Sequence, residues 1–119
     1  MNTTTFNRLL PLRQRSDSCC QDVSEPSMSQ PQTIRLADRL KALGDPTRLA
    51  ILDLLAQQTE PLCVCDITPR FAQNQPTISH HLRLLREAGL IESEKQGVWS
   101  YYWTTDLGRR CLEATAAME

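Results

Sequence analysis

The sequence lacks any apolar run approaching the roughly 18 residues that a membrane-spanning helix needs. Its first residues, MNTTTFNRLLPLRQRSD, also lack the long apolar stretch and the small-residue cleavage site of a secretory signal. We therefore expect no membrane anchor and a location in the cytoplasm. The 119 residues suffice for one compact domain with a tail, but not for two domains.

A strong excess of basic residues is absent as well, because the formal net charge is −1. Proteins that coat nucleic acids without selectivity usually show such an excess, so the composition disfavours that class. Between Arg70 and Arg110, however, basic residues outnumber acidic ones by 2. A local basic face is therefore compatible with the sequence.

The 5 cysteines do not suit a disulfide framework, which is typical of short secreted chains with an even number of cysteines. The sequence also lacks a Cys-x-x-Cys redox motif and a glycine-rich loop that could bind a phosphate. We therefore expect no enzyme. In a reducing cytosol, clustered thiols more often serve metals or redox chemistry, and here they form the pairs Cys19-Cys20 and Cys63-Val64-Cys65.

Two regions are distinguished by composition. Residues 1–32 are rich in Pro, Ser, Thr, Gln and Asn, which predicts a flexible tail that carries one cysteine pair. Residues 33–119 are predicted to form the folded domain. Apolar residues recur there at helical spacing from Thr33, and Gly44 ends the run. A second helix should follow at once, with Asp45 as its cap and Pro46 at its first position.

Prolines and glycines also set the limits of the later elements. Pro69 favours a third helix that begins near residues 64–66, because proline is tolerated only in a first helical turn. A fourth helix is predicted over residues 75–88, before Gly89. Two β-prone segments on either side of residues 95–97 predict a hairpin, and residues 106–118 are compatible with a last helix. The sequence therefore predicts a mostly helical fold with a small β-hairpin.

This order of elements is typical of a winged helix-turn-helix, in which two short helices joined by a tight turn precede a hairpin. The second of these helices lies in the major groove of DNA. Its polar side chains here suit base edges and phosphates, and they are Gln75, Thr77, Ser79, His80, Arg83 and Arg86. The alternative is an ordinary amphipathic helix with a solvated polar face. Adjacent helical residues diverge by about 100°, so His80 and His81 should chelate metals poorly, with one imidazole at the surface and one packed against the domain.

Three motifs occur in order: KALGDPTRLAILDLL, LCVCD and NQPTISHHLRLLREAGLI, the last followed by a short wing. Over about residues 35–105 the chain resembles the ArsR/SmtB family of bacterial metal-responsive repressors, and its arsenic-sensing branch in particular. The resemblance implies a winged helix-turn-helix homodimer that holds double-stranded operator DNA when metal-free and releases it when metal binds. It also implies DNA contacts by Gln75, Thr77, Ser79 and His80. In the wing, we expect Lys95, Gln96 and Gly97 to meet phosphate or the minor groove.

The same resemblance implies arsenite or antimonite as the inducer. Trivalent arsenic and antimony favour three thiolates, of which Cys63 and Cys65 supply two. Thr68 stands where the family motif often has a third cysteine. Some arsenic sensors of this family bring an N-terminal cysteine pair to the site, and Cys19 and Cys20 could do so because residues 21–32 reach roughly 40 Å when extended. Which cysteines bind, and whether two subunits share the site, stays open.

Residues two apart in a helix lie about 200° around its axis, so Cys63 and Cys65 should precede or cap the third helix. A helix N-terminus favours thiolates, and metal binding there would move the third helix and then the fourth. The alternative is a pair of small buried residues.

Other inducers are also compatible with the cysteines. Zinc or cadmium could take a four-thiolate site from Cys19, Cys20, Cys63 and Cys65. The family's zinc site on the last helix is not expected, because residues 106–119 contain no histidine. A thiol-redox switch on DNA binding is a further alternative. Cys111 lies alone on an apolar helix face, which predicts a core or dimer contact.

Overall fold

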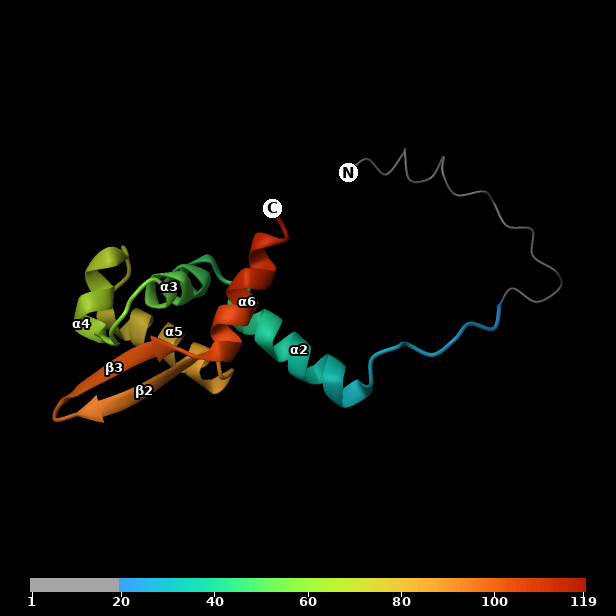
Figure 1. Cartoon of the computed structure of the whole chain (residues 1–119), viewed down its shortest axis with the longest axis horizontal. Coiled ribbons are helices and arrows are strands. Elements are labelled where there is room, and N and C mark those ends of the chain that lie inside the picture. Colours follow the sequence, from blue (N-terminus) through green and yellow to red (C-terminus); the bar gives the residue numbers. More distant parts are fainter. Residues whose placement is uncertain (1–19) are drawn as a thin grey trace.

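The computed structural model describes residues 20–119 (Figure 1). As predicted, this part of the chain is mostly helical with a small antiparallel sheet. Its helical elements are α2 (Gln30–Leu43), α3 (Pro46–Ala56), α4 (Val64–Ile67), the 3-10 turn η1 (Thr68–Arg70), α5 (Gln75–Glu87) and α6 (Asp106–Ala116). Its strands are β1 (Leu62–Cys63), β2 (Ile91–Gln96) and β3 (Trp99–Thr104). None of the helices within residues 20–119 is long and apolar enough to cross a bilayer.

The first described helix begins earlier than its apolar pattern. Helix α2 starts at Gln30, three residues before Thr33, because the Ser29 side chain accepts a bond from a first-turn amide and Pro31 fits that turn. Residues 20–29, which belong to the predicted tail, contain no helix or strand. Residues 1–19, including Cys19, lie outside the described part.

The predicted cap of helix α3 is confirmed. Oδ2 of Asp45 accepts hydrogen bonds from the backbone amides of Thr47 at 2.9 Å and Arg48 at 3.1 Å. Pro46 occupies the first helical position, where its missing N–H has no intrahelical partner in any case. The predicted stop after α5 and the predicted hairpin turn are also present, since Gly89 and Gly97 have φ angles of 79° and 64°.

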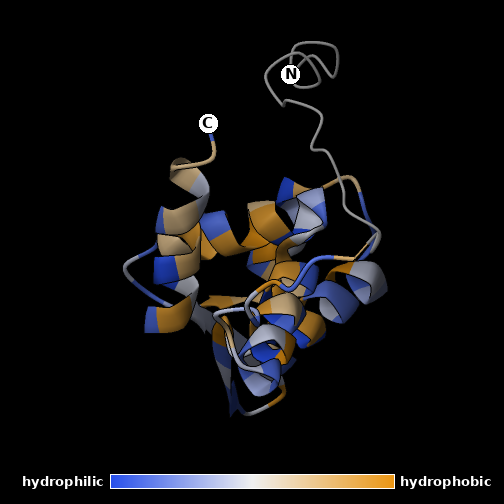
Figure 2. Ribbon diagram, turned by 90° about the vertical axis from the view of Figure 1, so that its right-hand side faces the viewer, coloured by the Kyte–Doolittle hydropathy of each residue, from blue (hydrophilic) through white to orange (hydrophobic). Residues whose placement is uncertain are grey.

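The core lies where α3, α4 and α5 meet one face of the sheet. Figure 2 shows hydrophobic residues gathered where the helices approach one another. The side chains that are fully shielded from solvent are Ile51, Leu52, Ile67, Ile78, Leu82, Leu85, Leu90 and Ile91. Three of them are the predicted apolar stripe of α5, so this helix is fixed by its inner face and offers its outer face to solvent.

The sheet has three strands in the order β1-β3-β2, all antiparallel. Strands β2 and β3 form the predicted hairpin, which projects from the helices in Figure 1. Strand β1 was not predicted, and it pairs Leu62 with Tyr102 and Cys63 with Tyr101. The second cysteine cluster therefore begins on the same sheet as the wing.

Candidate nucleic-acid interface and thiol site

Helix α5 presents the side chains that the sequence suggested for DNA. Oδ1 of Asn74 accepts a bond of 3.0 Å from the Thr77 amide and so fixes the start of the helix. Thr77 is half-buried, and the other four side chains are exposed: Gln75, Ser79, His80 and Arg83. Helix α4 with η1 precedes α5 and packs against it, which completes a helix-turn-helix.

The two adjacent histidines have different environments, as predicted. His80 is exposed, and its Nδ1 lies 2.9 Å from Nη2 of Arg83. His81 is 8% exposed, and its Nδ1 lies 3.3 Å from Nη1 of Arg48 on α3. Arginine only donates hydrogen bonds, so this nitrogen of His81 accepts. His81 therefore serves the attachment of α5 to the domain, whereas His80 stays available at the surface.

The wing is attached to α5 by a side-chain contact. Nη1 of Arg86 donates a 3.0 Å hydrogen bond to Oγ of Ser93 on β2. The residues at the end of the hairpin, Lys95, Gln96 and Gly97, are all exposed. Arg86 is one of the polar side chains of α5 that suit DNA, and its bond to Ser93 gives it a structural role that the helical pattern alone does not indicate.

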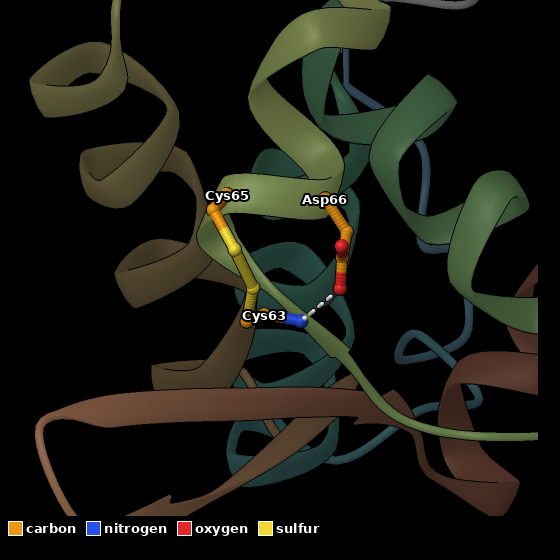
Figure 3. Close-up of side chains that lie close together, drawn as sticks. All are labelled: Cys63, Cys65 and Asp66. Atoms are coloured by element: carbon orange, nitrogen blue, oxygen red, sulfur yellow. Dashed lines mark hydrogen bonds between the residues drawn. A yellow bond between two sulfur atoms is a disulfide. The ribbon is translucent and has the colours of Figure 1, made fainter.

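The thiol pair lies where β1 passes into α4 (Figure 3). Cys63 is extended and occupies the cap position, and Cys65 lies in the first turn, so the expectation that the pair precedes or caps this helix is confirmed. In this structure the two sulfur atoms are joined as a disulfide, with the Cα atoms 5.3 Å apart. The composition disfavoured a disulfide framework, yet the change from extended to helical backbone brings these two residues within the usual Cα range for a bridge.

Asp66 belongs to the same cluster. Its Oδ2 accepts a 3.0 Å bond from the backbone amide of Cys63, and the ligand atoms of Cys63, Cys65 and Asp66 lie within 4.8 Å of one another (Figure 3). The sequence analysis missed Asp66, although its place three residues after a helix cap is a known signal for such a contact. In the reduced state the cluster offers two soft sulfur donors and one hard oxygen donor, which fits a thiophilic ion at least in part.

The remaining candidates near the cluster contribute less. Oγ1 of Thr68 donates a 2.8 Å bond to the carbonyl oxygen of Val64, so its hydroxyl proton is engaged within the helix. Cys20 is exposed ahead of α2 and does not belong to the donor cluster found among residues 20–119. Cys111 is half-buried on α6 and packs against the core, as one of its two predicted roles requires. Within residues 20–119 the structure thus brings Cys63 and Cys65 together, and the other predicted pair includes Cys19, which lies outside the described part.

Comparison with known sequences gives a family match and several similar proteins. A model of the arsR family of bacterial regulatory proteins matches residues 45–93. An HTH-type transcriptional regulator of Methanocaldococcus jannaschii is 47% identical over 72 residues, which cover 60% of this chain and 80% of that protein. The arsenical resistance operon repressor of Escherichia coli is 53% identical over 62 residues, which cover 52% of each chain. The chain thus spans only about half of the second relative.

Solved structures agree with these relatives. The solution structure of a homodimeric winged helix-turn-helix DNA-binding domain from Mycobacterium bovis aligns with a TM-score of 0.68 at 28% identity, over 82% of this chain and 89% of that one. This fold and this family are those of DNA-binding transcriptional regulators and not of enzymes. The chain belongs to the arsR family of bacterial regulatory proteins.

Proposed function

We propose that this protein is a repressor that binds operator DNA as a homodimer and releases it when trivalent arsenic or antimony binds its thiols. The observation that carries the proposal is the position of Cys63 and Cys65 at the start of α4, the helix that packs against the exposed reading helix α5. Several relatives are named arsenical resistance operon repressors, which supports the same inducer. Because operator DNA is its target, the proposal places the protein in the cytoplasm.

The DNA contacts that we propose follow from exposure and from docking geometry. A helix fixed by a fully buried inner face can lay its outer face in the major groove while the wing meets the backbone beside it. The proposed contacts are Gln75, Thr77, Ser79, His80, Arg83, Lys95, Gln96 and Gly97.

The proposed dimer contact lies on α2 and α6, at the other end of the domain from the wing tip (Figure 1). A groove of about 310 Å³ between these helices is lined mostly by apolar side chains. Leu40 on α2 is 60% exposed and Met118, just after α6, is 72% exposed, an arrangement that costs free energy unless a second surface covers it. The Mycobacterium bovis relative is a homodimer, which supports a second copy of this chain as the cover.

The inducer site that we propose consists of the reduced Cys63 and Cys65 with one thiolate from Cys19 or Cys20. Three thiolates satisfy the pyramidal preference of trivalent arsenic and antimony. Asp66 would then hold the Cys63 backbone and so orient its sulfur. When the sulfurs close around an ion, the first turn of α4 must adjust, and α5 packs on that turn. A zinc or cadmium site with all four thiolates is the alternative metal response.

The disulfide in this structure favours a second candidate, a redox-responsive repressor. Two thiols would lose two protons and two electrons to an oxidant such as hydrogen peroxide, which is reduced to two waters. The closed bridge would hold the first turn of α4 in one conformation, and the open pair would free it.

One set of titrations decides between these inducers. An operator is first selected from a random duplex library, and binding of the reduced full chain is followed by fluorescence anisotropy. Arsenite, antimonite, zinc, cadmium and hydrogen peroxide are then added in separate experiments. Release by arsenite or antimonite at the lowest concentrations supports the proposal. Release by zinc, cadmium or peroxide and not by arsenite or antimonite would show that this other agent is the inducer. Failure to select any DNA sequence from the library would contradict the repressor function itself.

A further inference from the structure

Aromatic residues are concentrated on the outward face of the wing sheet. The chain contains only 2 Trp, 2 Tyr and 2 Phe, and β3 carries both tryptophans and both tyrosines. Side chains alternate between the faces of a strand, and Ile91 and Thr104 mark the buried face because both are shielded and directly paired. Trp99, Tyr101 and Trp103 therefore form a row on the opposite, outward face.

Strand β1 places the thiol pair beside the middle of this row. Cys63 is the register partner of Tyr101, so the two side chains leave the same face of the sheet. Directly opposed residues of antiparallel strands have Cβ atoms about 5 Å apart. On the other side of Tyr101 lies Glu94 of β2, also its register partner. Tyr101 is half-buried, Cys63 is 4% exposed and Cys65 is exposed, so a small reagent reaches the pair from solvent at Cys65.

The number of thiols near Tyr101 determines how many bonds to sulfur a bound reagent can form. Cys63 and Cys65 can bridge a single atom because their sulfurs already meet in this structure. The third ligand atom of this cluster is a carboxylate oxygen of Asp66, a hard donor that suits trivalent arsenic poorly, and Thr68 offers only a hydroxyl whose proton is donated to Val64. Inorganic arsenite needs a third thiolate from elsewhere, whereas an arsenical with one carbon substituent needs only two.

We propose that Cys63 and Cys65 form a complete site for a monosubstituted trivalent arsenical, with Tyr101 as the wall that packs against its organic group. The inference rests on the proposed function, in that this thiol pair is the inducer site. In the reaction, two As–O bonds of an aryl- or alkylarsonous acid break, two As–S bonds form, and the two thiol protons leave in two waters. Arsenic stays trivalent. The disulfide must first be opened, for which a phosphine and water suffice because the phosphine is oxidised to its oxide.

The physical basis of the preference is apolar contact. The bound product is uncharged and carries its organic group beside Cys63, where the tyrosine ring lies on the same face. Packing an aryl ring against an aromatic side chain contributes about 0.5–1.5 kcal/mol beyond area burial, or roughly 3- to 10-fold in affinity. Inorganic arsenite has no such group, so the ring should leave its affinity unchanged.

The test uses the full chain reduced with a phosphine, without DNA. Affinities for phenylarsine oxide and for arsenite are measured by competition against a small dithiol, in the natural chain and in Tyr101→Phe, Tyr101→Ala and Trp99→Ala. Trp99 is the matched control, because it lies on the same face but is paired with Gln96. We expect Tyr101→Ala to lose roughly 3- to 10-fold for the phenyl compound only, and Tyr101→Phe and Trp99→Ala to keep the natural affinity.

A loss that is equal for both compounds, or no loss, would overturn the inference. A second measurement needs no variant. The affinity of the natural chain for phenylarsonous acid is divided by its affinity for methylarsonous acid, and this ratio is compared with the same ratio for the free dithiol. A ratio no higher than that of the free dithiol overturns the aromatic wall even if Tyr101→Ala fails to fold. Failure of the proposed function has a different signature, namely that arsenite leaves the operator complex of the natural chain intact.

Discussion

Arg48 and His81 join helices α3 and α5, with Nη1 of the arginine 3.3 Å from Nδ1 of the histidine. The same guanidinium donates from Nε to the carbonyl oxygen of Ala42 at 2.7 Å and from Nη2 to that of Lys41 at 3.3 Å. One side chain thus ties the end of α2 and the start of α3 to the reading helix. This link, together with the buried apolar face of α5, holds α5 against α2 and α3.

Replacing Arg48 by Ala should lower the free energy of unfolding by about 2 kcal/mol, because it removes charge-assisted bonds and leaves half-buried acceptors unpaired. Operator affinity should fall as well, since α5 loses part of its attachment. Urea denaturation and fluorescence anisotropy measure the two effects. Arg35→Ala, at an exposed position of α2, is the control and should leave both unchanged. Equal behaviour of the two variants would show that the link carries no stability.

Asp45 should give the stability of the domain a dependence on acid. The hydrogen bond from the Arg48 amide, with smaller effects from the Arg48 charge and the Thr47 amide, holds the pKa of this carboxyl below its ordinary value of 3.8. A lowered pKa means that the unfolded chain takes up the proton first, so the contribution is complete above pH 3.8 and is lost as pH falls through the lower folded value.

The measurement is urea denaturation between about pH 2.5 and 6, across the range in which carboxyl groups titrate. Asp45→Asn keeps an oxygen acceptor at the cap and should flatten this part of the pH profile. Asp45→Ala removes the cap and should lower stability by about 1 kcal/mol near neutral pH. An Asn variant with the same acid dependence as the natural chain would assign that dependence to other carboxyl groups.

The features that could be predicted from the sequence are those set by residues close together in the chain. The starts of α3 and α5 were predictable because Asp45-Pro46 and Asn74-Gln75-Pro76 place a cap beside a first-turn proline. The hairpin was predictable because Gly97 permits its turn. Strand β1 was not, because two residues show no period and their partners lie on β3, far along the chain.

The candidate site divides in the same way. The exposed face of α5 follows from helical periodicity. The start of α4 at Val64 agrees with the position predicted from Pro69, although Pro69 itself lies in the separate 3-10 turn η1. The pairing of Cys63 with Tyr101 and the bond from Arg86 to Ser93 join separate elements, which no local pattern indicates. Asp66 is the intermediate case. Its place three residues after the cap residue Cys63 can be recognised in the sequence, but its closeness to both sulfurs is known only from the structure.

The reading helix should distinguish operator from random DNA. Ser79→Ala or His80→Ala should weaken operator binding by about 1–3 kcal/mol and random-duplex binding far less, because base contacts carry sequence information. Glu113→Ala on the exposed side of α6 is the control. Half-sites should be related by two-fold symmetry with a spacing of about 10 base pairs or a multiple. Equal losses on both kinds of duplex would reduce α5 to a contact without selectivity.

The wing should contribute affinity with little sequence preference. Lys95 is exposed near the end of the hairpin, so Lys95→Gln should reduce the salt dependence of binding by about one ion per subunit, with similar losses on operator and random DNA. Lys41→Gln, on α2 and away from the wing, is the matched control. A salt slope that stays the same in the Lys95 variant would place the wing outside the interface.

The cysteines should separate induction from DNA binding. Cys63→Ser and Cys65→Ser should each abolish release by arsenite and keep operator affinity, because both residues lie in the β1–α4 region and not on the outer face of α5. Deletion of residues 1–28 removes Cys19 and Cys20 but keeps Ser29, the cap of α2, and so should preserve folding. The truncated chain should bind the operator yet respond weakly to arsenite, since only two thiolates remain at the site.

X-ray absorption of the arsenite complex gives the independent readout for this truncation. The full chain should show three sulfur neighbours per arsenic, and the truncated chain two with an oxygen in place of the third. Cys111→Ser is the control, because its half-buried position on α6 packs against the core and should change neither release nor coordination. A truncated chain that releases DNA at the natural arsenite concentration, with three sulfurs still bound, would mean that neither tail cysteine serves the site and that a sulfur within residues 29–119 completes it.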